Sequence, residues 1–403
     1  MRLLFISTLY PNSINPHLAS YNRQLIDAIS KKIEVRVIAP VLWFPGIKPE
    51  PDGKLPPFRE KIGDVVVTHP RIFYTPGLFV YYHWQMYRWS LRKHFLTVLN
   101  EFQPDAILIG FLYPDASAVV PLCREVGIPY ALRVNGSDFR IRVKQTKFRN
   151  IIMKLLTQAP LVFCPGEVLR YDIIQSGVPE EKVIAFRNGV DRSLFRFRTR
   201  QEAIREFAER RWRPPSLGDE RYVLFAGNLQ KVKGADRLIL AWRDIWSRHR
   251  GVQLVLIGDG PERRRLERMA RSISCDPPIS FMGVLPHDIV ALWLNLADCL
   301  CVPSRSEGMP NIVLESLASG TPVIATDVGE IPFMVKEGIN GYVVQTRNFD
   351  ENNIVTELAR RIESALWQNW NKQFISEHSC IDSWDEAGML IIENIKRLLN
   401  GKT

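Results

Sequence analysis

The chain has 403 residues, of which 46% are hydrophobic and 24% are charged, and these proportions exclude a disordered or fibrous protein. At roughly 150 residues per domain, this length predicts two or three domains whose cores need neither disulfides nor a structural metal. The 53 Lys and Arg against 43 Asp and Glu give a net charge of +10, which suits an anionic membrane or a phosphorylated substrate; nucleic acid is not expected as a partner, because no zinc finger or RNP-type signature occurs.

The first half of the chain predicts alternating strands and helices. Residues 2–9 form an apolar strand rather than a signal peptide, and residues 21–32 have helical hydrophobic spacing. Further strands are expected at 34–39, 105–110, 129–134, 161–164 and 183–186. No segment approaches the roughly 20 apolar residues of a membrane-spanning helix. Six scattered cysteines without a C-x-x-C pair fit reduced thiols, so we expect a cytoplasmic protein.

The second half repeats this pattern. A strand at 222–226 leads through a loop at 227–234 into a helix, and further strands are expected at 252–257, 279–282, 298–302, 322–326 and 341–344. Continuous apolar strands that alternate with amphipathic helices are typical of parallel sheets covered on both faces. We therefore expect an α/β protein of two doubly wound domains, residues 1–195 and 196–379, with a cleft between the domains. The polar stretch at 196–220 is expected to be a linker region that contains a charged helical piece at 200–211.

The segment from Pro303 to Gly329 is the most informative about chemistry. A strand ending at residue 302 runs into a short loop, Pro310 suits the first position of a helix, and Gly320 suits its C-terminal cap. Backbone N–H groups within Gly308-Met309-Pro310-Asn311 then lack helical partners. Because the helix dipole adds to them, this segment is predicted to bind a phosphate without a basic side chain.

Two carboxylates accompany that segment, with Glu307 before the helix and Glu315 inside it. A glycoside hydrolase uses two carboxylates as acid and base, but these two need not face one another. A better division gives one carboxylate to a sugar and the other to a ribose diol, since two acceptor oxygens suit vicinal hydroxyls. For an isolated pair, the simplest interpretation is two acids that complement the helix dipole.

Glu307-x7-Glu315, followed by Gly320-Thr-Pro-Val and Asp327-Val-Gly, closely resembles the signature of the retaining glycosyltransferases of family 4 (glycosyltransferase group 1). The likeness covers nearly the whole chain and includes Asn188-Gly-Val-Asp191, Gly227-Asn-Leu with Lys233-Gly234, Gly258-Asp-Gly-Pro261, Phe281-Met-Gly283 and the region of Trp384. The resemblance implies the GT-B fold, which consists of two Rossmann-like domains. It also implies a C-terminal helix, at about 380–403, that packs back onto the first domain.

The resemblance further implies an enzyme of the hexosyltransferase type and a role for each matching residue. Lys233 is expected to neutralise the diphosphate of a nucleotide-sugar donor together with the backbone of residues 308–311. Glu307 is expected to hold donor-sugar hydroxyls and Glu315 the ribose. The other expected donor contacts come from Asn228, Gly258 and Val284. No metal or other cofactor is expected, because Lys233 and helix N–H groups take its place and no Asp-x-Asp motif occurs.

Three positions depart from the family pattern. Asn228 stands where members often carry Arg, and the first loop, on the acceptor side, contains His17, Ala19 and Ser20 where members often have Gly-Gly. The frequent His-Gly-x-Asp motif is Asn135-Gly-Ser-Asp138, and asparagine cannot take a proton. Asn135 and Asp138 are still assigned to the catalytic residues with Glu307 and Lys233. In the front-face mechanism proposed for the family, the departing phosphate oxygen accepts the acceptor's proton.

The sequence specifies the acceptor less clearly. Residues 73–96 combine many aromatic residues with Arg88, Arg92 and Lys93, which suits a membrane interface or, equally, a core-packing helix with a solvated basic end. We expect a glycan or lipid-linked acceptor, a role in surface polysaccharide or glycolipid assembly, and peripheral contact with the anionic inner face of the plasma membrane. Two alternatives stay open: a non-catalytic sugar- or lipid-binding protein on the same fold, and a nucleotide-sugar epimerase or hydrolase.

Overall fold

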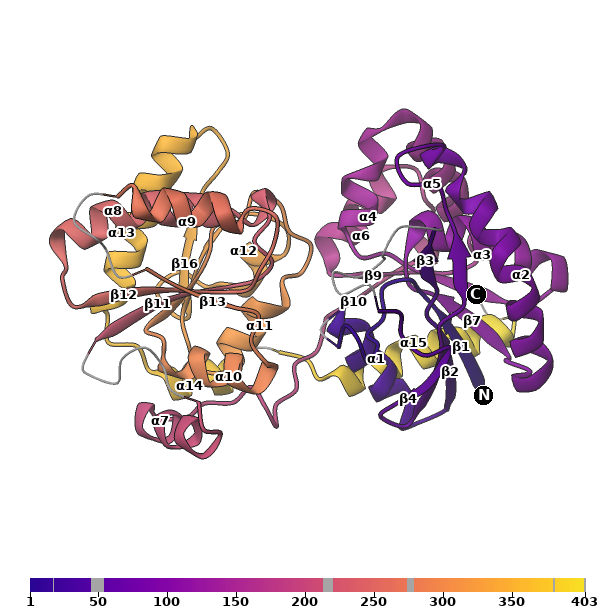
Figure 1. Ribbon diagram of the computed structural model, residues 1–403, viewed down its shortest axis with the longest axis horizontal. Coiled ribbons are helices and arrows are strands. Elements are labelled where there is room, and N and C mark those ends of the chain that lie inside the picture. The colour runs from indigo at the N-terminus through magenta and orange to yellow at the C-terminus, as the bar shows by residue number, and fades with distance from the viewer. Residues whose placement is uncertain (17, 45–53, 213–219, 274–278, 380, 402–403) are drawn as a thin grey trace. The chain divides into compact units, whose positions relative to one another are not determined.

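The computed structural model describes residues 1–16, 18–44, 54–212, 220–273, 279–379 and 381–401. The chain divides into two compact units: unit 1, Met1–Gly189 with Asp382–Thr403, and unit 2, Val190–Ile381 (Figure 1). The sequence predicted the boundary after residue 195, whereas the structure has it after Gly189. The reason is that Val190 and Phe195 are buried in the core of unit 2. Unit 1 is therefore built from two separate stretches of chain, and unit 2 lies between them in the sequence.

Unit 1 is built on an eight-stranded sheet with the order β10-β9-β8-β7-β1-β2-β5-β4. Its strands are β1 (Arg2–Ile6), β2 (Glu34–Ile38), β4 (Arg59–Ile62), β5 (Val65–Thr68), β7 (Ala106–Ile109), β8 (Tyr130–Arg133), β9 (Val162–Pro165) and β10 (Val183–Phe186). Neighbouring strands are parallel except for the edge hairpin of β4 and β5. A separate short pair joins β3 (Val41–Trp43) to β6 (Arg71–Phe73). All six strands expected in this half are present, whereas both short pairs were missed.

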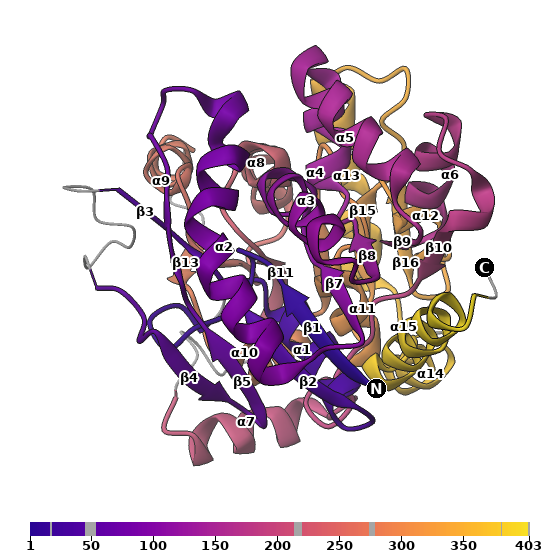
Figure 2. The same ribbon diagram turned by 90° about the vertical axis from the view of Figure 1, so that its right-hand side faces the viewer.

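Helices cover both faces of this sheet. Leu4 and Ile6 face one side, together with residues of α2 (His83–Phe102), α3 (Ser117–Val126) and α5 (Thr146–Gln158). Figure 2 shows α2 and α3 across the near face of the strands. Leu3 and Phe5 face the opposite side, where α1 (Ser20–Ser30) packs against α15 (Trp384–Leu399). The C-terminal helix thus completes the core of unit 1, although it follows unit 2 in the chain.

Unit 2 has a six-stranded parallel sheet with the order β13-β12-β11-β14-β15-β16. The strands are β11 (Arg221–Ala226), β12 (Val252–Ile257), β13 (Ile279–Gly283), β14 (Cys299–Val302), β15 (Val323–Thr326) and β16 (Gly341–Val344). This is the 3-2-1-4-5-6 strand order of dinucleotide-binding folds, in which ligands bind where the order reverses. The reversal lies between β11 and β14, so the loops after these two strands are the expected place for a ligand.

The helices of unit 2 also form two layers. On one face α8 (Ala235–Arg248), α9 (Arg263–Arg271) and α13 (Glu351–Trp367) share a core with Trp242. On the other face lie α10 (His287–Leu296), α11 (Asn311–Ala318) and α14 (Lys372–His378). The charged helical piece predicted at 200–211 is confirmed as α7 (Arg200–Glu209), which starts at a Thr199–Glu202 capping box. Because α7 buries Phe207 in this core, the helix is part of unit 2 and not a separate linker. Residues 213–219 of the polar stretch at 196–220 lie outside the described residues.

Candidate functional site

Two oppositely charged side chains meet at the reversal of strand order in unit 2. Lys233 lies in the loop after β11 and Glu307 in the loop after β14. The Lys233 ammonium donates to both carboxylate oxygens of Glu307 at 2.8 Å. The Glu307 side chain is only 8% exposed and that of Lys233 is 32% exposed. The hydroxyl of Ser304 donates to Oε1 of Glu307 at 2.7 Å, which fixes the carboxylate from the other side.

The backbones of the two loops are in direct contact. The N–H of Arg305 donates to the carbonyl of Val232 at 2.7 Å. Gly234 has φ of 70°, and a Cβ on it would lie 2.0 Å from the carbonyl oxygen of Pro303. Only glycine fits this approach, since any larger residue would strain its own backbone and push the loops apart. The separation of Lys233 from Glu307 is therefore set by the backbone.

A group of charged side chains braces these loops from behind. The guanidinium of Arg305 binds both carboxylate oxygens of Asp236, at 2.8 and 3.0 Å. Arg237, which is buried, binds both oxygens of Glu351 at 2.8 and 2.7 Å and also donates to the carbonyl of Pro303 at 3.2 Å. Burial acts to raise the pKa of Asp236, but the hydrogen bonds and charge of Arg305 outweigh it, so the pKa lies below its usual value. These pairs join the starts of α8 and α13 to the loop after β14.

The segment predicted to bind phosphate leads into α11. Pro310 is the residue before the helix, with φ −74° and ψ 112°, so the prediction that it opens the helix is wrong by one residue. Among the described residues no side chain caps this helix start, and the N–H of Val313 donates to the carbonyl of Pro310 at 3.1 Å. The positive end of the helix dipole at this start favours an anion. The carbonyl of Gly308 accepts from the N–H of Glu330 at 2.9 Å. At the other end, Ser319 caps the helix and Gly320 follows with φ 81°.

Glu315 lies in the middle of α11 and is half-buried. Burial raises its pKa from the usual 4.5 to about 7. Near neutral pH this carboxyl is therefore close to half protonated, so it can both donate and accept hydrogen bonds. This property suits a diol, whose hydroxyls also do both.

Tight turns lie at the carboxyl ends of β11, β12 and β13. The N–H of Gly258 donates to the carbonyl of Gly283 at 2.7 Å, and Val284, which follows, has an exposed side chain. A Cβ on Gly258 would lie 1.9 Å from the carbonyl oxygen of Gly227, and one on Gly260 would lie 2.4 Å from Oδ1 of Asn228. The side chain of Asn228 is thus packed against the Gly258–Gly260 turn.

In unit 1, Asn135 and Asp138 brace loops at the carboxyl ends of β7 and β8. The amide of Asn135 donates to the carbonyl of Gly110 at 2.7 Å, and its Oδ1 accepts from Arg133 at 2.7 Å. The buried carboxylate of Asp138 accepts from the N–H of Asn135 at 3.0 Å and from that of Leu112 at 3.1 Å. Burial raises the pKa of Asp138 to about 6. Both assigned residues are engaged with the protein itself.

The start of α1 holds the acceptor-side loop residues. Ala19 caps the helix with φ 47° and ψ 49°, the left-handed conformation in which glycine is unstrained, and Ser20 is the first helical residue. His17 lies outside the described residues. Ala19 is thus held in a conformation that is strained for alanine.

The sequence analysis overlooked Arg133, which ends the apolar strand β8 and is fully buried. Its guanidinium donates to Asn135 and to Asn22 of α1 and lies 5.2 Å from the Tyr21 ring centre. Burial lowers its pKa to about 10. The sequence did contain a sign of this role, since Arg133 stands at the end of a continuous apolar strand. A charged residue that is buried there requires polar partners.

Family comparisons match both halves of the chain. The family model described as "Glycosyltransferase Family 4" matches residues 18–194, and the one described as "Glycosyl transferases group 1" matches residues 206–376. The chain belongs to the group 1 glycosyltransferases. It is therefore a transferase. Lys233, Glu307 and Glu315 lie in the second matched region and Asn135 in the first.

Similar proteins agree with this family and with its fold. TuaC of Bacillus subtilis, a glycosyltransferase named for teichuronic acid biosynthesis, is 26% identical over 342 residues, which cover 82% of each chain. Sucrose-phosphate synthase from Thermosynechococcus elongatus superimposes with a TM-score of 0.77 at 19% identity over 100% of both chains. Anabaena HepE, solved with UDP and glucose, gives 0.72 at 17% identity over 98% of this chain and 99% of its own. The expected GT-B fold, with two Rossmann-like domains, is confirmed.

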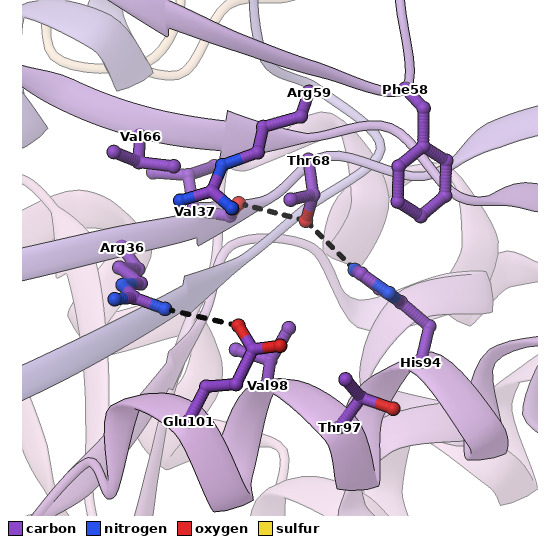
Figure 3. A pocket seen from close by; sticks show the side chains of 10 residues that line it. All are labelled: Arg36, Val37, Phe58, Arg59, Val66, Thr68, His94, Thr97, Val98 and Glu101. Carbon is purple, nitrogen blue, oxygen red and sulfur yellow. Dashed lines mark hydrogen bonds and ion pairs between the residues drawn. The ribbon is translucent and has the colours of Figure 1, made fainter.

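Unit 1 of this glycosyltransferase also has a polar hollow of about 120 Å³ between α2 and the edge of the sheet (Figure 3). Arg36 and Glu101 form an ion pair across it at 3.6 Å, and His94 bonds the hydroxyl of Thr68 at 2.9 Å. Arg59 of β4 lies along its rim. The hollow shares no residue with the predicted site.

The described part of the chain contains no helix that is both long and apolar enough to cross a membrane. It also holds no group of three or more His, Cys, Asp or Glu side chains placed to bind a metal ion.

Proposed function

We propose that this glycosyltransferase moves a sugar from a nucleoside diphosphate sugar to a hydroxyl acceptor, with retention of the anomeric configuration. The observation that carries the proposal is the Lys233–Glu307 pair beside the uncapped start of α11, at the reversal of strand order in unit 2. A cation, a cluster of N–H groups and a carboxylate suit a sugar diphosphate, since the first two bind phosphate and the third binds hydroxyls. That HepE was solved with UDP and glucose supports a donor of this class.

Each residue then has a part in binding the donor. Lys233 and the N–H groups at the start of α11 take the diphosphate, and Glu307 takes hydroxyls of the donor sugar. Glu315 takes the ribose diol, where its raised pKa lets it donate as well as accept. The backbone at Gly258 and Val284 brackets the base. The donor site needs no metal, because Lys233 and the helix start supply the positive charge.

The chemistry requires little from protein side chains. The bond from the anomeric carbon to the diphosphate oxygen breaks, and a bond from that carbon to the acceptor oxygen forms on the same face. The acceptor's proton goes to the departing phosphate oxygen, so the absence of a histidine at position 135 is tolerated. The rate enhancement then comes from the positioning of donor and acceptor and from the stabilisation of negative charge on the leaving diphosphate.

We propose that the acceptor is a glycan or a lipid-linked glycan of a surface polysaccharide or glycolipid, bound at unit 1. The similarity to TuaC, named for teichuronic acid biosynthesis, supports this setting. Unit 1 also has an exposed aromatic surface, which we define as Leu78, Phe79, Tyr82 and Trp89. Arg88, Arg92 and Lys93 lie on the same helix as Trp89, α2, where Arg88 and Arg92 both form ion pairs with Glu125. Aromatic and basic side chains together suit the anionic face of a membrane, so peripheral contact there is part of the proposal.

A thermal-shift screen with UDP, GDP, ADP, dTDP and CMP, each with its sugars, tests the donor proposal. A ligand at a hundred times its dissociation constant stabilises the folded protein by about 2.7 kcal/mol, which corresponds to a shift of several degrees. We expect one base to give a clear shift and Glu315→Ala to abolish it. A folded sample that no nucleotide stabilises would contradict the proposal and favour a binding protein on the same fold.

A measurement of turnover distinguishes a transferase from a hydrolase or an epimerase. Sugar must leave the donor only when a hydroxyl acceptor is present. Release of free sugar or of an epimerised nucleotide sugar without an acceptor would instead indicate a hydrolase or an epimerase.

A further inference from the structure

The Lys233–Glu307 ion pair occupies the two groups that the donor requires. Lys233 uses its ammonium to bridge both oxygens of Glu307 at 2.8 Å. Glu307 also receives the hydroxyl of Ser304, and its side chain is almost removed from water. A diphosphate that approaches Lys233 must therefore compete with a carboxylate that is already in place.

The two loops cannot relieve this competition by moving apart. The Arg305–Val232 backbone bond and the approach of Gly234 to Pro303 hold them together, and Arg237 braces the carbonyl of Pro303 from the core. The ligand and Glu307 must therefore compete for Lys233 through movement of side chains alone. When a phosphate draws Lys233 away, the Glu307 carboxylate loses its cation while a second negative charge arrives beside it. A largely buried carboxylate that loses its counter-charge is destabilised, even though the hydroxyl of Ser304 still donates to it.

We propose that Glu307 makes this site discriminate between a nucleoside diphosphate sugar and the bare nucleoside diphosphate. The inference rests on the proposed function and deepens it. A donor carries sugar hydroxyls that donate to Glu307 and compensate for the loss of Lys233, whereas a bare diphosphate offers only negative oxygens. The carboxylate therefore weakens binding of the product relative to the donor.

This discrimination acts at the end of each turnover. Once the sugar has left for the acceptor, the hydroxyls that satisfied Glu307 are gone. The carboxylate then competes for Lys233 again and favours release of the nucleoside diphosphate. Glu307 is thus a specificity-determining residue in addition to a sugar ligand.

The test compares affinities of the full chain for UDP and UDP-glucose, with GDP and GDP-mannose measured in parallel, by titration calorimetry. Glu307→Gln keeps the size of the side chain and removes its charge. A hydrogen bond from a charged group is worth roughly 10- to 150-fold in affinity, and because Lys233 is partly exposed we expect the lower end, about tenfold tighter binding of the bare diphosphate. The nucleotide sugar should bind no tighter, so the ratio of the two affinities falls by about tenfold.

A matched control and a second variant isolate the cause. Glu337→Gln removes another ion-paired carboxylate of unit 2, the partner of Arg361, and should leave both affinities unchanged. Lys233→Met should weaken both ligands, and adding Glu307→Gln to it should then give no gain. If Glu307→Gln weakens the bare diphosphate, leaves it unchanged, or tightens it equally without Lys233, the inference is wrong although the donor site stands. If the wild-type chain binds neither these four ligands nor any other nucleotide or nucleotide sugar of the thermal-shift screen, the proposed function itself is wrong.

Discussion

At the residue scale, two glutamates eight positions apart have different environments and different chemistry. Glu307 is paired with the ammonium of Lys233, while Glu315 lies in a helix whose neighbours Val313, Leu314 and Leu317 are buried in the core. Burial raises the pKa of Glu315 to about 7. Glu307 is thus paired with a cation, whereas Glu315 has a pKa close to neutral pH. These different environments are consistent with the proposal that Glu307 binds the donor sugar and Glu315 the ribose.

The raised pKa of Glu315 predicts a pH dependence of stability. The folded state holds the proton of this carboxyl more tightly than the unfolded state, so its stabilising contribution is full below about pH 4.5 and is lost as the pH rises through about 7. Glu315→Gln removes this contribution. Between pH 5 and pH 8 the wild-type chain should therefore lose about 2 kcal/mol relative to the variant, or roughly 4–8 °C in the Tm of unit 2.

Differential scanning calorimetry at pH 5, 6, 7 and 8 measures this difference. Comparing variant with wild type cancels the titration of the other buried carboxyls, such as Asp115 and Asp138. Glu337→Gln serves as the control, because its side chain is 52% exposed. Wild-type and Glu315→Gln curves that run parallel across this range would rule out the buried, partly protonated state.

The sequence predicted which residues belong to the site better than it predicted their contacts. The Glu-x7-Glu motif singled out Glu307 and Glu315, and the loop after the first strand of unit 2 singled out Lys233. That Lys233 and Glu307 bind each other depends on the adjacency of β11 and β14, which the order of elements along the chain does not specify. The hydrogen bonds of Asn135 could not be predicted for the same reason, because Gly110 follows β7 whereas Arg133 ends β8.

At the element scale, the site depends on two strand–loop–helix units whose loops contact each other, with an especially close backbone approach at Gly234. Gly234 ends the loop after β11 and lies against Pro303, the first residue after β14. The loops of a Rossmann-like sheet are usually set by the strands alone, but here they are also fixed to each other. The geometry of the cation and the carboxylate is therefore preorganised rather than formed on binding.

Gly234→Ala should disrupt this arrangement. The new Cβ would meet the carbonyl oxygen of Pro303 at 2.0 Å and would also be strained at φ 70°. We expect a loss of about 2 kcal/mol or more of stability in unit 2 and weaker nucleotide binding. Gly251→Ala is the matched control, since no atom lies within 4 Å of its added Cβ. Equal Tm values for the two variants would contradict the role given to the contact.

Most strands with a continuous apolar run appear close to their expected positions, but β5, Val65–Thr68, was missed although it reads Val-Val-Val-Thr. The edge strand β4 reads Arg-Glu-Lys-Ile and alternates in exposure, so it lacks the apolar run of a buried strand. The charged surface of α7 suggested a linker, but Ala203 and Phe207 on its inner face anchor it in unit 2.

At the scale of the whole molecule, the net charge of +10 and the exposed aromatic surface of unit 1 are the features on which the proposed contact with an anionic membrane rests. Trp89 is 79% exposed and Phe79 is 63% exposed, which is costly in water unless another surface covers them. Lys and Arg near a membrane each add about 1 kcal/mol of attraction to anionic lipids.

Flotation with vesicles tests this surface. The wild-type chain should float with vesicles that contain phosphatidylglycerol and much less with neutral phosphatidylcholine. The double variant Phe79→Ser, Trp89→Ala should lose about tenfold or more of the binding, since each buried aromatic contributes of the order of 1.5 kcal/mol. Phe333→Ser, which removes an aromatic residue that is 73% exposed on unit 2, is the control. Equal flotation with both lipids, or of both variants, would contradict a membrane-facing role.

The path of the chain has a consequence for how the protein is made in a cell. Unit 1 shares its core between α1 and α15, and the whole of unit 2 is synthesised between these two helices. A ribosome therefore completes unit 2 first, while Leu25 and Ile29 of α1 still lack the helix that packs against them. A nascent chain interrupted before Trp384 would carry a finished unit 2 and an unfinished unit 1. Unit 1 can therefore complete its core only after α15, which ends at Leu399, has been synthesised.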